Sequence, residues 1–147
     1  MRNASATPRT SRGSGSVGSI VINALLLYAV GHLGDWQIGW ITPAWADAVW
    51  ALSLSLEVSI AANAVLLLYE HDWLRYPLLT VCSLFALQAV AVLYMVYPFD
   101  FGFASNDLAR LALLALILAV GIGTFVTAIL AVLHLLRAAA RGLGEPT

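Results

Sequence analysis

Charged residues are scarce in this chain, and lysine is missing altogether. Asp, Glu, Lys and Arg make up only 10% of the residues, whereas a typical soluble domain has about 25%. All seven basic residues are arginine, and the net charge of −1 leaves no basic footprint for nucleic acid. The composition therefore argues against a nucleic-acid-binding protein and against a soluble fold.

Cysteine is almost absent too. The single Cys82 excludes an intramolecular disulfide and any multi-cysteine metal site, and we interpret it as a small buried hydrophobic residue. His71 lies between Glu70 and Asp72, but this triplet lacks the paired spacing of zinc motifs. No glycine-flanked serine marks a nucleophile either. We therefore predict no catalytic residue, no metal and no cofactor.

Most of the chain consists of long apolar stretches. Hydrophobic residues make up 61% of the chain, and the mean hydropathy is +0.89. Four apolar stretches lie at about residues 17–33, 48–69, 78–97 and 108–136. Because about 20 apolar residues span a bilayer as a helix, we expect an all-α membrane protein, an antiparallel four-helix transmembrane bundle over residues 17–136. Residues 1–16 are expected to form a disordered basic tail, and residues 137–147 a short tail.

Arginine predicts the orientation in the bilayer. Arginines occur before the first stretch (Arg2, Arg9 and Arg12), between the second and third (Arg75), and after the fourth (Arg137 and Arg141). The other two connections contain only acidic charges, and Arg110 lies just inside the fourth stretch. Positively charged connections stay in the cytoplasm, so both termini are predicted to be cytoplasmic.

Aromatic residues gather on the predicted outer side. We call the set the outer aromatic face: Trp36, Trp40, Trp45, Trp50, Tyr97, Phe99 and Phe101. Tryptophan and tyrosine are common at the membrane–water interface, so one interpretation is a simple interfacial belt. The alternative is a binding surface for lipid or a partner protein, because aromatic residues dominate binding hot spots.

Glu57 is the most informative polar residue, because it lies near the middle of the second stretch, where a carboxylate is costly. Depth counted from the cytoplasmic edges at about 1.5 Å per residue places Gln88 level with it. We expect Glu57 to point into the bundle and to bond with Gln88 or Ser53, with an ion pair to Arg110 as the alternative. This contact either fixes packing or supports a proton- or ligand-linked role. The remaining alternative is a carboxyl group that faces lipid.

Asn23 and Asn63 form a second polar layer on the first two stretches, at similar depths. Asparagine side chains often join transmembrane helices by hydrogen bonds. We therefore predict that they stabilise helix packing.

Four short features stand out along the chain: NALLLY at residues 23–28, the tryptophan-rich loop, Asn63 followed by DWLR at residues 72–75, and YPFDF at residues 97–101. With these features the chain resembles a family of small actinobacterial membrane proteins with no known activity. The resemblance implies four spans in a bacterial inner membrane. It transfers no functional residues.

Two functions remain open at this stage. The first is a non-catalytic accessory or scaffold subunit whose outer aromatic face binds a partner protein or lipid, with homo-oligomers possible. The second is a small transporter or proton-linked binding protein centred on Glu57. A water-filled pocket that ends at Glu57 would favour the second.

Overall fold

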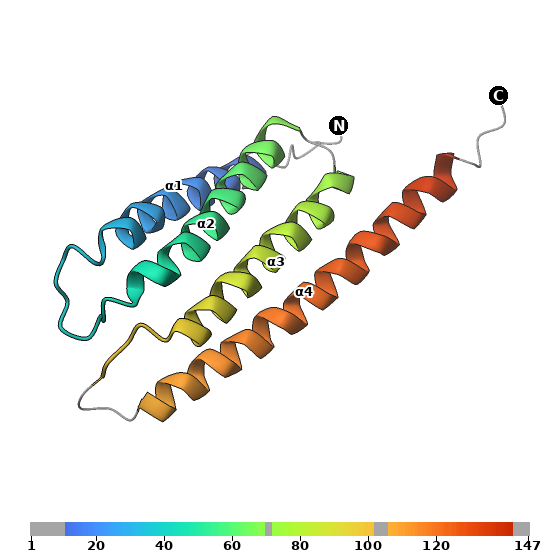
Figure 1. Cartoon of the computed structure of the whole chain (residues 1–147). Helices are drawn as coiled ribbons and strands as arrows, with labels where there is room; N and C mark the ends of the chain where they lie inside the picture. Colours follow the sequence, from blue (N-terminus) through green and yellow to red (C-terminus); the bar gives the residue numbers. More distant parts are fainter. Residues whose placement is uncertain (1–10, 70–71, 102–105, 143–147) are drawn as a thin grey trace, which may run out of the picture.

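The computed structural model describes residues 11–69, 72–101 and 106–142. It contains four helices: α1 (Ser11–His32), α2 (Trp45–Leu68), α3 (Asp72–Val96) and α4 (Asn106–Gly142). Each is long and apolar enough to cross a bilayer, so the chain is built as a multi-pass membrane protein. The predicted antiparallel four-helix transmembrane fold is confirmed (Figure 1).

The helices are longer than the apolar stretches alone predict. α1 begins at Ser11, inside the predicted disordered tail, and α4 continues to Gly142. The remainder of the two predicted tails, residues 1–10 and 143–147, lies outside the described residues. The ends of the helices differ from the ends of the apolar stretches because a helix continues as long as its backbone hydrogen bonds are made, whether or not lipid surrounds it.

Pro77 shows the same effect at the start of α3. It directly precedes the third apolar stretch, which begins at residue 78, yet it lies inside the helix. The first four N–H groups of a helix have no partner within the helix, so a proline just beyond the first turn removes only one hydrogen bond. Pro98 lies two residues after Val96, the last residue of α3, and is fully buried.

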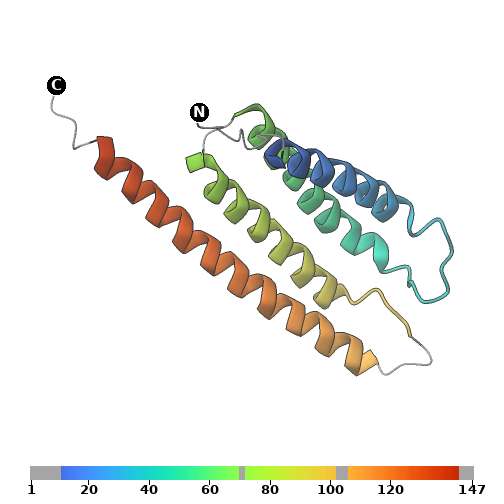
Figure 2. The same cartoon turned by 180° about the vertical axis from the view of Figure 1, so that it is seen from behind.

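The helices form an open layer. α1 packs on α2, α2 on α3 and α3 on α4, and within the described residues α1 and α4 do not meet. Figures 1 and 2 show this row from both sides, with the α1–α2 and α3–α4 connections together at one end. We call that end the loop end and the opposite one the terminal end.

Small residues lie where the helices touch. The buried apolar side chains are mostly alanine: Ala48, Ala51, Ala62, Ala89 and Ala131. Large side chains point outward instead, and Leu68 and Met95 are 76% and 73% exposed. This is the arrangement expected in lipid, where apolar residues gain nothing by leaving the surface and small residues let helix backbones approach.

Candidate functional site

Backbone hydrogen bonds join the two connections at the loop end. Ile41 and Phe99 form an isolated antiparallel β-bridge. The amide of Thr42 donates to the carbonyl of Pro98 over 3.0 Å, and that of Asp100 to the carbonyl of Trp40 over 2.9 Å. Segments far apart in the sequence thus form one surface.

Aromatic rings pack around this bridge. Phe99 is the centre, with ring centroids 5.9 Å from Trp40, 6.3 Å from Trp45, 6.0 Å from Tyr97 and 5.7 Å from Phe101. Trp40 also stacks on Phe101 at 5.5 Å. Aromatic pairs at these distances stabilise by about 0.5–1.5 kcal/mol each beyond their buried area. We call these five residues the loop cluster.

Trp45 belongs to the core more than to a binding surface. It is 6% exposed, and its indole Nε1 donates to the carbonyl of Val30 over 3.3 Å. Its ring also lies close to Gly34, where an added Cβ would be 3.7 Å from Trp45 Cδ1. Trp45 therefore ties the end of α1 to the start of α2, which corrects its assignment to an exposed face.

Trp36 and Trp50 lie outside the loop cluster. They are 52% and 53% exposed, and Trp40 is 39% exposed. The outer aromatic face therefore divides into a packed part and free rings. The free rings are the part that another molecule can reach.

Tyr97 and Arg110 fix the second connection. The hydroxyl of Tyr97 donates to the carbonyl of Asn106 over 3.0 Å, and the guanidinium of Arg110 lies 4.7 Å from the centre of the Tyr97 ring. Tyr97 has a backbone φ of 43°, a conformation that residues other than glycine rarely adopt. The cation–π contact occupies Arg110 at the loop end, so the alternative ion pair with Glu57 is not formed.

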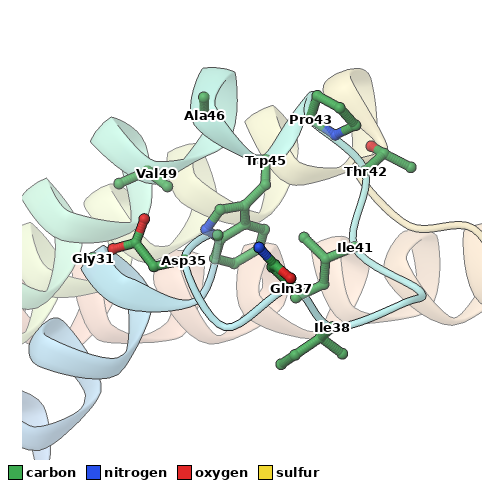
Figure 3. Close-up of a pocket in the computed structure, with 11 residues that line it drawn as sticks. Gly31, Asp35, Gln37, Ile38, Ile41, Thr42, Pro43, Trp45, Ala46 and Val49 are labelled. Carbon is green, nitrogen blue, oxygen red and sulfur yellow. The ribbon is translucent and has the colours of Figure 1, made fainter.

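An open hollow of about 590 Å³ lies beside the first connection. Figure 3 shows Trp45, Asp35 and Gln37 around it, with Gly31 and Val49 on the helix side. Gln37 also has a positive φ, of 49°. The lining is mostly apolar, with Asp35, Gln37 and Thr42 as its polar side chains, which suits an apolar group that carries a polar or cationic end.

Glu57 and Gln88 do not meet. Both are exposed, and among the described residues neither forms a hydrogen bond with the other, with Ser53 or with Arg110. The contact of Cys82 Sγ with the carbonyl of Val58, at 4.0 Å, sets the register of α2 and α3. Because α2 and α3 are antiparallel, this register places Ser83 opposite Glu57. Gln88 is five residues further along α3 and therefore lies about 7.5 Å nearer the loop end.

The expected Glu57–Gln88 bond is therefore wrong, and so is the expectation that Glu57 points into the bundle. The depth count used residue 78 as the edge of the third span, whereas α3 begins at Asp72. Glu57 lies nine residues from the buried Ala48, which is about 180° around the helix. Its side chain points away from both neighbouring helices.

The second polar layer does join helices. Nδ2 of Asn23 donates to Oγ of Ser59 over 2.8 Å, between α1 and α2. Asn63 donates to the backbone carbonyl of Ser59, also at 2.8 Å. Asn23 therefore joins α1 to α2 through Ser59, whereas the bond of Asn63 stays within α2. Sequence analysis missed Ser59, although its position one turn before Asn63 was visible.

Replacing Ser59 with alanine should lower the free energy of unfolding by about 0.6–1.7 kcal/mol, because it removes this interhelical hydrogen bond. Unfolding in mild detergent measures the effect. Ser55→Ala is the matched control, since Ser55 is half-buried on the same helix and has no hydrogen bond among the described residues. Equal losses in both variants would contradict the assignment.

A further polar contact links α3 and α4. Oγ of Ser83 lies 3.4 Å from Oγ1 of Thr127, and Thr127 in turn donates to the carbonyl of Thr124. His134 stacks on Tyr76 with ring centroids 4.2 Å apart. These contacts are structural, and no group of three or more potential metal ligands occurs in the part of the chain that the structure describes. His71 lies outside that part.

Comparison with known proteins assigns no activity to this arrangement. No family model, no curated protein and no solved structure matches the chain. The resemblance to small actinobacterial membrane proteins thus stays a prediction.

Proposed function

We propose that this protein is a non-catalytic membrane subunit that binds a partner protein or lipid headgroups through the free part of its outer aromatic face. One observation carries the proposal: the β-bridge and loop cluster hold two distant connections as one surface, with Trp36 and Trp40 exposed on it. Trp40 is held by the loop cluster, and Trp36 lies free beside it. A fixed aromatic side chain such as Trp40 binds with little loss of conformational entropy. We further propose a bacterial inner membrane, with the loop end outside.

The transporter alternative lacks a comparable observation. The hollow at the loop end is not lined by Glu57, and a second, apolar groove of about 400 Å³ lies between α3 and α4, around Leu87 and Gly121. A substrate path centred on Glu57 would need a polar cavity at that residue. We therefore favour binding over transport.

The orientation predicts how introduced thiols react. In a Cys82→Ala background, Gly39→Cys should react with a membrane-impermeant maleimide on intact cells, because Gly39 is exposed at the loop end. Arg75→Cys should react only after permeabilisation, since Arg75 is exposed near the terminal end and arginine-bearing connections are cytoplasmic. The reverse pattern would place the outer aromatic face inside.

Trp36→Ala tests the binding proposal. Trp36 is 52% exposed and has no ring contact among the described residues, so its loss should leave folding intact. Recovery of the bound partner from detergent-solubilised membranes should fall about 30-fold if Trp36 has the effect of a typical hot-spot residue.

The matched control is Tyr69→Ala. Tyr69 is 58% exposed, but it follows α2 at the terminal end. This variant should recover the partner as the native protein does. Unchanged recovery with Trp36→Ala, or an equal loss with Tyr69→Ala, would speak against a binding surface at the loop end.

A further inference from the structure

The face of α2 that points away from α1 and α3 carries a carboxyl group at mid-membrane depth. Glu57 is the thirteenth of the 24 residues of α2. α2 uses Ser59 and Trp45 to contact α1, and Val58 to contact α3. None of these residues shares a face with Glu57, so both neighbouring helices leave it free.

Among the described residues, Glu57 has no hydrogen-bond partner, in contrast to several other polar residues of the spans. Asn23, Asn63, Ser83 and Thr127 all form hydrogen bonds within the chain. Glu57 forms none among the described residues, and its side chain is exposed. An ionisable group at this depth is costly against lipid chains and normally faces protein or water. Something other than lipid is therefore expected over this face.

Small and polar residues surround Glu57 on the same face. Ser53, Ala61 and Ala64 lie four residues before, four after and seven after it, within about 40° around the helix axis. Ala61 is exposed, and Ser53 and Ala64 are half-buried. Such residues let a second helix approach closely, and side-chain hydrogen bonds then form between the helices.

We infer that the occupant is a second copy of this chain, with α2 packed on α2 about a twofold axis parallel to the membrane normal. Symmetry places the two Glu57 side chains at the same depth on either side of that axis. A protonated carboxyl group both donates and accepts a hydrogen bond, so two of them satisfy each other.

This pairing needs no cation from a different protein. Arg110, the arginine nearest to the spans at the loop end, already lies over Tyr97. A different partner would have to supply its own donor at this depth, whereas a second copy supplies one by symmetry. Hydrogen-bond complementarity therefore favours the homodimer.

Disulfide trapping tests the contact in native membranes. In the full chain with Cys82→Ala, Ala61→Cys should form disulfide-linked dimers on mild oxidation. Leu25→Cys on α1 and Ile122→Cys on α4 are matched controls, because both positions are 65–66% exposed but lie on other helices. Dimers from Ala61→Cys that do not exceed those of the controls would overturn the proposal.

A second measurement does not depend on introduced cysteines. Energy transfer between labelled copies in phosphatidylcholine vesicles should show that Glu57→Leu weakens association about 3- to 20-fold, the range of one or two membrane hydrogen bonds. Glu57→Gln keeps a donor and an acceptor and should stay close to the native protein. Native protein that is monomeric, or Glu57→Leu that associates as tightly as the native protein, would show that lipid or another protein covers this face.

Discussion

Replacing Trp45 with alanine is expected to lower the free energy of unfolding by about 3–5 kcal/mol, the largest loss for any side chain in the structure. The indole is 6% exposed, lies close to Gly34, packs on Phe99 and donates to the carbonyl of Val30. Its removal leaves a cavity where α1, α2 and the second connection meet. It also leaves that carbonyl without the indole donor.

Denaturant titration in mild detergent measures this loss. Trp45→Phe keeps a six-membered aromatic ring and loses the donor and the volume of the second ring, so the free energy of unfolding should fall less than in Trp45→Ala. Trp36→Ala is the exposed control and should change the free energy of unfolding by less than about 0.5 kcal/mol. A Trp45→Ala variant as stable as Trp36→Ala would show that the loop end is not packed around Trp45.

Replacing Ala48 with leucine should have the second-largest effect, a loss of about 1–3 kcal/mol or more through overpacking. Ala48 is 1% exposed on the buried face of α2. A larger side chain there would push the neighbouring helices apart, because small residues allow their close approach.

Ala119→Leu is the matched control for Ala48→Leu. Ala119 is exposed on α4, so the added atoms would meet only lipid or detergent. The same titration compares the two variants. If Ala48→Leu unfolded at the same denaturant concentration as Ala119→Leu, the helices would not be in close contact at Ala48.

Fold class was predictable because one physical constraint dominates it. A backbone that crosses lipid must satisfy its own hydrogen bonds, and runs of about 20 apolar residues do so only as helices. The fourth predicted span therefore falls inside α4, and each of the first three runs only one residue past the end of its helix. The exact starts were not predictable, as Ser11 and Pro77 show, because helical hydrogen bonds do not stop where apolar residues do.

Side-chain contacts were harder to predict, because they depend on register and on which helices meet. Glu57 and Gln88 were paired by depth alone, but the early start of α3 shifts the register, and both residues turn away from their neighbours. Trp45 was grouped with exposed rings because sequence cannot distinguish a buried tryptophan from an interfacial one. The contact between the two connections at Ile41 and Phe99 could not be predicted from the sequence, because a single β-bridge produces no periodic pattern of apolar residues.

Site-specific photo-crosslinking in living cells tests the proposed binding surface most directly. A photoreactive amino acid replaces Gly39, exposed in the first connection, or Leu136, 61% exposed on α4 near the terminal end. The proposed function predicts a discrete protein or lipid-headgroup adduct from position 39, absent from position 136 and lost when Trp36 is replaced by alanine. The same adducts from both positions, unaffected by Trp36→Ala, would contradict it.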